Sequence, residues 1–403
     1  MAVVAGTVLS AVRTVVLPRA AQSLITRTVF RNSARIFRLL AGEGRSYEWR
    51  DKVMALYAPI TLVMLPGAWL ALLALAYTAM FWAIGYGSVM SSFRAAGSSL
   101  LTLGVSALEG WSQSVLGFTA AALGLTMVAL LITFLPSLYA AFSRREQQVT
   151  LLEVRAGSPP SAVEMLLRVH RIGWIDRLPQ FWLQWEVWFA DLEESHTSYP
   201  ALAWFRSPRS DQSWVTAAGT VLDGAALCQS AVREAKSAAA ALCLRAGYLA
   251  LRRVAGFFGV TFDPNPQRGD QISITRAEFD EVLTQLREAG IELVDDLDTA
   301  WLDFAGWRVN YDTVLLALAE LTIAPYAPWT SDRSAPDHLR PRLSRWGSVR
   351  FSPATGGLSR PRRRSVRRGT PEGGERLVDH DLQATVSDSQ RRFHLRGGGS
   401  RGK

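Results

Sequence analysis

Residues that build catalytic and metal centres are scarce in this sequence. It holds two cysteines and five histidines, with no HExxH pair and no GxxxxGK[ST] phosphate loop. Cys228 and Cys243 lack the neighbouring histidine pair of a zinc site, and a reducing cytosol disfavours a disulfide between them. These absences argue against an enzyme, and no cofactor or bound metal is expected.

Charged side chains are missing from two long windows, residues 53–93 and 110–143. A helix of about 20 apolar residues crosses the hydrocarbon core of a bilayer, and each window exceeds that length. We place one transmembrane helix in each, over residues 56–84 and 115–142. A soluble protein of this size has little room to bury both, so the sequence predicts an integral membrane protein embedded in the lipid bilayer.

Basic residues flank the two windows unevenly. Only Arg94 lies between them, and lysine and arginine mark the cytoplasmic side of a membrane protein. We therefore expect a multi-pass protein of the cell (inner or plasma) membrane with both termini in the cytoplasm and the connector outside. The basic residues before the first window are Arg27, Arg31, Arg35, Arg38, Arg45, Arg50 and Lys52, and those after the second are Arg144, Arg145, Arg155 and Arg168.

The first 18 residues are apolar apart from Arg13 and end at Pro18. A secretory signal carries its charge before the apolar run and a small-residue cleavage site after it, and neither feature is present. Two interpretations remain open, an amphipathic helix lying in the membrane interface and a short third span that would place the N-terminus outside. We treat residues 1–52 as an N-terminal interfacial and basic segment, followed by a two-span membrane domain over residues 53–143.

Residues 144–330 have the size and composition of a mainly helical cytoplasmic domain. Thr275 and Glu278 have the spacing of a capping box, an apolar run with helical spacing follows, and Gly290 is placed to end that helix. The Ala- and Leu-rich stretch 217–258 and residues 311–322 are also expected to be helical. The predicted fold class is therefore all-α.

Two further patterns in this domain have competing interpretations. Trp182, Trp185 and Trp188 recur at a spacing of three, which indicates an aromatic face packed in a core or lying on the membrane in preference to a ligand cage. The polar patch at residues 193–198, EESHTS, is interpreted as a solvated loop in preference to a reactive site.

The C-terminal segment 331–403 is rich in Arg, Gly, Ser and Pro and is predicted to be a disordered tail. Its run RPRRRSVRR at residues 360–368 is suited to contact anionic lipid at the cytoplasmic face, with Ser365 as a phosphorylation switch. The alternative is a tail that is simply solvated. No specific nucleic-acid partner is expected, because no folded module here matches a known nucleic-acid reader.

The connector between the two windows, residues 91–110, reads SSFRAAGSSLLTLGVSALEG. It is too short for a folded outside domain, and residues 95–108 carry no charge, so it is too apolar for a free loop. We expect it to dip back into the membrane. Non-helical backbone is tolerated at that depth only inside protein or lining a water-filled cavity, which indicates a pore loop made of a half helix followed by extended backbone.

A span, a short helix ending in TLGVS and a second span together resemble the outline of two-transmembrane potassium channels. The filter of those channels has the form T-[VI]-G-[YF]-G, and its carbonyl oxygens replace the hydration shell of the ion. The resemblance covers residues 55–143 and implies a cation-conducting pore assembled as a homotetramer. Monovalent cations, potassium among them, are the partners that it implies.

Residue by residue, the resemblance assigns Thr102 to the inner mouth of the filter and Leu103 to the position that braces it. Gly104 corresponds to the first filter glycine, whose flexible backbone directs carbonyls inward. The chain departs from the family at Val105, where an aromatic ring is usual, and at Ser106, where the second glycine is usual, so the permeant ion stays open. Ser98 and Ser99 correspond to the pore helix.

The second predicted span also fits an inner pore helix. Gly117 and Gly124 are hinge candidates, and Pro136 is placed to kink the cytoplasmic end. Small residues such as Gly117, Ala121 and Gly124 also let helices pack closely in lipid, and the two interpretations are compatible.

The segments RREQQVTLLEVRAGSPPSAVEML and WLDFAGWRVNYD also resemble an uncharacterised family of bacterial membrane proteins, which implies no activity. The leading hypothesis is therefore an ion channel subunit of the pore-loop type with a cytoplasmic regulatory domain. The alternative is a non-conducting, membrane-anchored scaffold or sensor that acts through residues 144–330.

Overall fold

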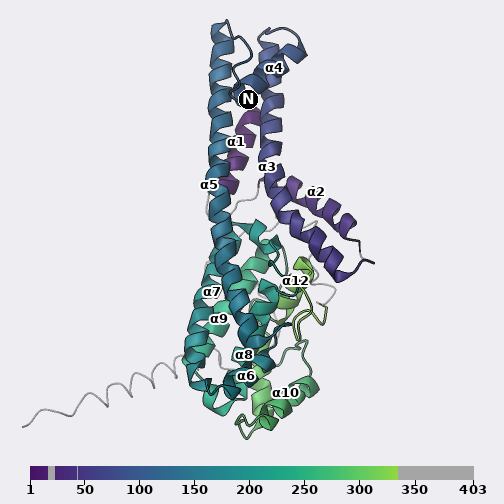
Figure 1. Cartoon of the computed structure of the whole chain (residues 1–403), viewed down its shortest axis with the longest axis vertical. Coiled ribbons are helices and arrows are strands. Elements are labelled where there is room, and N and C mark those ends of the chain that lie inside the picture. Colours follow the sequence, from purple (N-terminus) through teal and green to yellow (C-terminus); the bar gives the residue numbers. More distant parts are fainter. Residues whose placement is uncertain (17–22, 43, 335–403) are drawn as a thin grey trace, which may run out of the picture. The chain divides into compact units, whose positions relative to one another are not determined.

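The computed structural model describes residues 1–16, 23–42 and 44–334 (Figure 1). Throughout these ranges the regular elements are helices, and no strand occurs among them. This confirms the predicted all-α class for the described part of the chain.

Two helices are long and apolar enough to cross a membrane, α3 (Tyr47–Ala83, 37 residues) and α5 (Trp111–Ala156, 46 residues). They contain most of the two charge-free windows, as the sequence predicts. Only 39% of the apolar window of α3 and 22% of that of α5 are buried, whereas the core helix of a soluble protein is mostly buried. Large apolar side chains such as Phe118, Leu125 and Ile132 are therefore left on the surface of α5.

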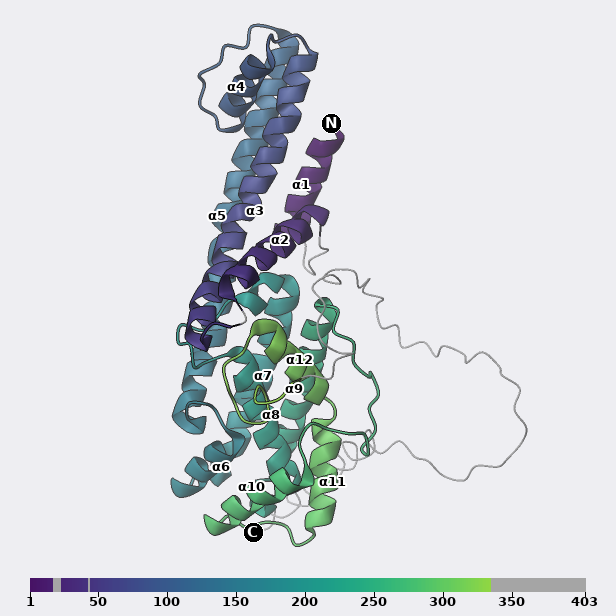
Figure 2. The same ribbon diagram turned by 90° about the vertical axis from the view of Figure 1, so that its right-hand side faces the viewer.

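Two N-terminal helices pack against α3, α1 (Ala2–Val15) and α2 (Leu24–Ala41) (Figures 1 and 2). Trp69 Nε1 of α3 donates to Ser10 Oγ at 3.0 Å, and the amino terminus lies 4.0 Å from Met80 Sδ. These two contacts make α1 antiparallel to α3. That orientation is the one expected of a short third span.

The helix α2 packs through an aromatic contact in the N-terminal part of α3. Its Phe30 and Phe37 rings pack edge-on against Tyr57 of α3, with centroids 6.4 and 5.7 Å away. Tyr57 also packs edge-on against Trp204 at 5.4 Å. One aromatic cluster thus joins α2, α3 and the region after α5.

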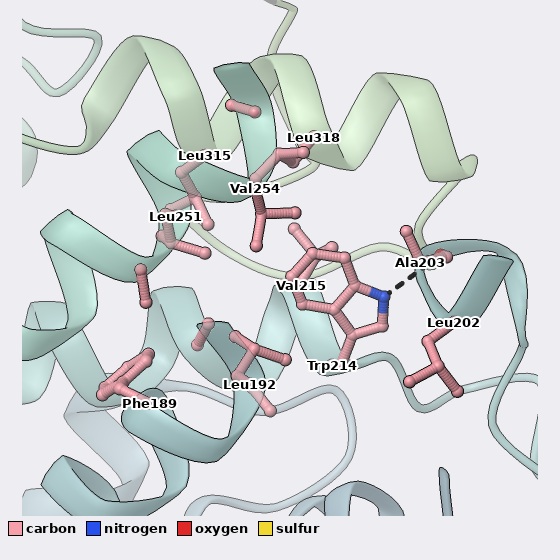
Figure 3. Packing of buried hydrophobic residues seen from close by; sticks show 14 of the residues in the cluster. Phe189, Leu192, Leu202, Ala203, Trp214, Val215, Leu251, Val254, Leu315 and Leu318 are labelled. Carbon is pink, nitrogen blue, oxygen red and sulfur yellow. Dashed lines mark hydrogen bonds between the residues drawn. The ribbon is translucent and has the colours of Figure 1, made fainter. Parts of the chain in front are cut away.

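The region after α5 is a bundle of helices around α8, whose residues are almost all buried. Figure 3 shows part of this core, where Trp214 Nε1 donates to the Ala203 carbonyl at 3.3 Å among side chains of four helices. The helices are α6 (Ala162–Arg171), α7 (Leu178–Ser198), α8 (Trp214–Ser230), α9 (Ala238–Phe257), α10 (Arg276–Glu288), α11 (Leu297–Arg308) and α12 (Asp312–Thr322), with short 3₁₀ turns η1 at Ile175–Arg177, η2 at Pro200–Trp204 and η3 at Arg233–Ala235.

The predictions for this region that depend on residues close together in the sequence are confirmed. Thr275 and Glu278 form the predicted capping box at the start of α10, and Gly290 takes φ +88° just after that helix. Trp182, Trp185 and Trp188 are buried in the core, as one of their interpretations expects. The stretch 217–258 is divided between α8 and α9, which are separated by the turn around η3.

The interpretation of residues 193–198 as a solvated loop is wrong. They form the end of α7, and His196 is fully buried. His196 Nε2 lies 3.1 Å from Arg145 Nη1, and its Nδ1 lies 2.9 Å from the Leu192 carbonyl. Burial and the neighbouring Arg145 charge lower the pKa of His196 well below its usual value, so the ring is neutral and accepts from Arg145.

The predicted tail lies outside the described residues from position 335 onward, and with it the run 360–368 and Ser365. The described part continues past the expected boundary at residue 330. Arg333 donates to the Ser273 carbonyl at 2.6 Å and to Glu278 at 2.8 Å. The packed helical region therefore includes residues 331–333.

Candidate functional site

The connector between α3 and α5 contains one helix, α4 (Val89–Leu100), followed by ten residues of irregular backbone. The chain leaves α3 through Gly85 and Gly87, whose φ values of +78° and +119° permit the reversal. Ser88 then caps α4 by accepting from the Ser91 amide at 3.2 Å. Figure 2 shows α4 beside α3 and α5 at the end where the connector joins them.

Two glycines of α5 determine how far α4 reaches along it. A Cβ atom on Gly124 would lie 1.8 Å from the Leu100 carbonyl oxygen, so the end of α4 touches the α5 backbone there. Gly124 is about 20 Å from Trp111 along the helix axis, at about 1.5 Å per residue. A Cβ on Gly117 would lie 2.3 Å from Leu108 Cδ1, so the returning chain passes this glycine. The connector therefore runs far along α5 and returns.

The predicted hinge residues thus have a packing role in this structure. Gly117, Ala120 and Gly124 are buried on one side of α5, which is the close-packing interpretation of the small residues. Pro136 lies inside α5, and the helix continues through it to Ala156. Their action as gating hinges stays a prediction.

Ser98 connects the end of α4 to the residues that follow it. Its Oγ accepts from the Val105 amide at 3.0 Å and from the Ser106 amide at 3.2 Å. The Ser98 carbonyl accepts from the Leu103 amide at 2.8 Å. One predicted pore-helix serine therefore holds three of the five predicted filter residues, whereas Ser99 makes no side-chain hydrogen bond within the described residues.

The backbone of the predicted filter takes two unusual conformations. Thr102 has φ +53° and Gly104 has φ +68°, a region that favours glycine and costs other residues about 1–2 kcal/mol. The Thr102 hydroxyl donates to the Leu101 carbonyl at 2.8 Å. The side chains of Leu103 and Val105 are 60% and 77% exposed in the single chain. The predicted filter is therefore a non-helical segment held by hydrogen bonds to Ser98. Its exposed side chains, Leu103 and Val105, are not covered by other described residues.

Replacing Ser98 with alanine is expected to free this segment. Two part-buried amides would lose their acceptor, which costs about 1 kcal/mol. In hydrogen exchange of the detergent-solubilised protein, the Val105 and Ser106 amides of Ser98→Ala should exchange at least about fivefold faster. Ser99→Ala is the matched control and should leave them unchanged; equal exchange in the two variants would contradict the role of Ser98.

A second polar site joins α3 to the helical region. Arg206 donates to the carbonyls of Thr322 and Ile323 at 2.7 and 2.8 Å, at the C-terminal end of α12. The same guanidinium contacts Asp51 of α3 and donates to the Tyr47 hydroxyl at 2.8 Å. Arg206 therefore connects the end of α12 to the first turns of α3 through a nearly buried ion pair.

The sequence did not predict the long-range contacts of Arg145, Arg206 and Arg308. Each is bonded to groups more than fifty residues away in the chain, and no local pattern marks such a pair. Within the described residues, no group of three His, Cys, Asp or Glu side chains could hold a metal ion. Cys228 and Cys243 are both buried.

No family model, curated protein or solved structure matches this chain.

Proposed function

We propose that this chain is the subunit of a pore-loop ion channel that conducts cations and assembles as a homotetramer. In this proposal α3 and α5 span the cell membrane, and α4 with residues 101–110 re-enters it. The observation that carries the proposal is the end of α4 beside Gly124, followed by a backbone pinned by Ser98. A short helix that stops deep beside a span and returns as irregular backbone is the arrangement that presents carbonyl groups to an ion.

Four copies are proposed because one subunit supplies only a quarter of a pore of this type. The exposed side chains of Leu103 and Val105, and the apolar outer face of α5, offer contact surface to other copies and to lipid. The antiparallel packing of α1 on α3 supports the alternative of a short third span, in which residue 1 would lie outside the cell with the connector instead of in the cytoplasm. The helical region lies in the cytoplasm in this proposal. The Arg206 site supports a regulatory role for that region, because it connects α12 to the start of α3.

Gly104→Ala is expected to abolish cation flux. A Cβ atom there meets nothing within 4 Å, but φ +68° strains any residue other than glycine, at a cost of about 1–2 kcal/mol. The full chain should be reconstituted in liposomes loaded with potassium, and efflux followed with an ion-sensitive dye. Gly97→Ala, inside α4 with open space around it, is the control and should conduct.

The size of the assembly separates this proposal from its alternative. A tetramer in nanodiscs, together with potassium efflux from liposomes, supports the channel. A monomer or dimer in nanodiscs, together with no efflux from liposomes, overturns it. The alternative, a non-conducting scaffold or sensor, is favoured by one observation. Ile172, Trp174, Leu183 and Val187 leave large apolar side chains exposed on the helical region, as a docking surface for a protein would.

A further inference from the structure

We infer that an anionic phospholipid of the cytoplasmic leaflet binds in a groove between α1, α2 and α3, with its headgroup held by the arginines of α2. The inference rests on the membrane placement in the proposed function, and it is independent of ion conduction.

The groove has a volume of about 370 Å³ and is lined by three helices. Val3 and Leu9 come from α1, Leu24 and Ile25 from α2, and Leu72 from α3. Along α1 it extends from Val3 to Arg13, about 15 Å at about 1.5 Å per residue. An elongated apolar groove with one cationic end suits an acyl chain attached to a charged headgroup.

The cationic end faces the cytoplasmic side of α3. Arg13 lies one turn beyond Ser10, which accepts from Trp69, while Met1 lies beside Met80 nearer the outer end of α3. A lipid bound with its headgroup at Arg13 and its chain toward Val3 therefore has the orientation of the cytoplasmic leaflet.

The α2 helix continues this basic end of the groove. Arg27, Arg31, Arg35 and Arg38 recur at spacings of four, four and three residues, which places them on one face of the helix. That face begins one turn after Leu24 and Ile25, which line the groove. Guanidinium groups at this position can donate hydrogen bonds to several headgroup oxygens.

Charge complementarity identifies the lipid as anionic. Neither α1 nor α2 contains an acidic residue. Among the four α2 arginines, Arg38 interacts with the charge of Glu320, whereas Arg27, Arg31 and Arg35 form no ion pair with a described residue. The Arg31 Nε–H is buried, and no described residue accepts from it. These guanidiniums have donors left for phosphate oxygens.

Exposed aliphatic side chains on α2 support contact with lipid. Leu39 is 82% exposed and Leu24 is 72% exposed, and Ile36 and Leu40 are also exposed. A helix that combines such residues with arginines lies in the interface between acyl chains and headgroups. An aqueous phosphate would satisfy the arginines but leave these side chains and the groove in water.

Photolabelling of the full chain in nanodiscs tests the inference. The probes are phosphatidylglycerol and phosphatidylcholine with the same diazirine-bearing acyl chain, and labelled peptides are identified by mass spectrometry. Phosphatidylglycerol should label residues 3–13 and 24–31 about tenfold more than phosphatidylcholine does. Arg27→Gln/Arg31→Gln/Arg35→Gln should remove that preference, whereas the charge-matched control Arg171→Gln/Arg245→Gln/Arg287→Gln, exposed on the helical region, should keep it.

A second variant fills the groove without changing charge. Gly6 lines the groove, and a Cβ atom there would meet nothing within 4 Å, so Gly6→Leu should fold and reduce phosphatidylglycerol labelling of residues 3–13. Equal labelling by the two lipids, or labelling unaffected by both variants, overturns the inference. If both lipids label α5 in either case, the membrane placement stands without the groove; if neither labels α5, the membrane placement fails as well.

Discussion

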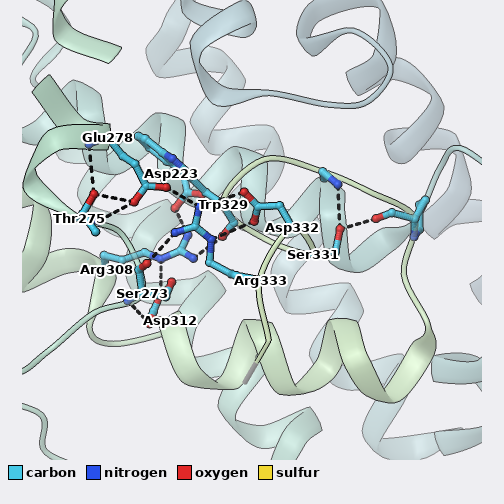
Figure 4. A network of polar contacts seen from close by, with 12 residues as sticks. Asp223, Ser273, Thr275, Glu278, Arg308, Asp312, Trp329, Ser331, Asp332 and Arg333 are labelled. Carbon is cyan, nitrogen blue, oxygen red and sulfur yellow. Dashed lines mark hydrogen bonds and ion pairs between the residues drawn. The ribbon is translucent and has the colours of Figure 1, made fainter. Parts of the chain in front are cut away.

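Arg308→Met is expected to destabilise the helical region by about 3–5 kcal/mol, because it would leave two buried carboxylates without their cation. The Arg308 side chain is fully buried between Asp223 and Asp312, and it also donates to the Trp329 carbonyl (Figure 4). Burial lowers the pKa of the guanidinium, but the two carboxylates more than offset this and raise it above its usual value. Arg308 therefore stays charged in the folded protein.

The loss would extend beyond Arg308, because the two carboxylates connect three helices, the segment before α10 and the C-terminal segment. Asp223 of α8 also accepts from the Tyr311 hydroxyl at 2.8 Å. Asp312 of α12 accepts from the Ser273 amide at 2.8 Å and from its hydroxyl at 2.6 Å. Without Arg308, α8, α11 and α12 would meet at two like charges in a low-dielectric core.

Thermal unfolding of the full chain in detergent, followed by tryptophan fluorescence, measures the effect. Arg253→Met is the control, because Arg253 pairs with Glu193 at the surface with about half its side chain exposed, and it should unfold close to the wild-type Tm. Adding Asp223→Asn and Asp312→Asn to Arg308→Met should recover part of the loss, since the buried charges are then removed together. If Arg308→Met has the same Tm as Arg253→Met, Arg308 does not stabilise the helical region as described.

Gly124→Ala is expected to displace α4 from α5 and to abolish flux. The added methyl group would lie 1.8 Å from the Leu100 carbonyl oxygen, which belongs to backbone and cannot rotate away. Overpacking of this kind costs about 1–3 kcal/mol, against the gain of about 1 kcal/mol that alanine normally brings to a helix. The Tm of the solubilised protein should fall, and liposomes should lose potassium efflux.

Gly67→Ala is the matched control for this variant. Gly67 lies inside α3, and a Cβ atom there would meet nothing within 4 Å, so its Tm should be unchanged or higher. Flux that survives Gly124→Ala at a wild-type Tm would show that α4 does not pack at this position. Flux lost at a wild-type Tm would instead favour the interpretation of Gly124 as a hinge.

Features that depend on neighbouring residues alone could be predicted for this protein. The two apolar helices follow from windows without charge, because the cost of placing each residue in lipid is set by its own chemistry. The capping box at Thr275 and the ending at Gly290 depend on contacts within one turn. The short helix before Thr102, with Ser98 and Ser99 in it, is expected from the apolar connector and from the resemblance to two-transmembrane channels, and α4 occupies these residues.

Features that depend on distant partners were settled only by the tertiary structure. His196 sits in the polar sequence EESHTS, yet it is buried, because Arg145 from α5 satisfies its ring nitrogen. Gly124 has two interpretations in the sequence, and the Leu100 carbonyl beside it shows that it is a point of close contact, whereas its action as a hinge stays a prediction. Arg308 would be an ordinary surface arginine by composition, and it is buried because Asp223, far away in the chain, supplies the opposite charge. The sequence by itself therefore determined which segments are apolar helices. Which charges are buried, and which glycines are points of close contact, depends on residues far apart in the chain that only folding brings together.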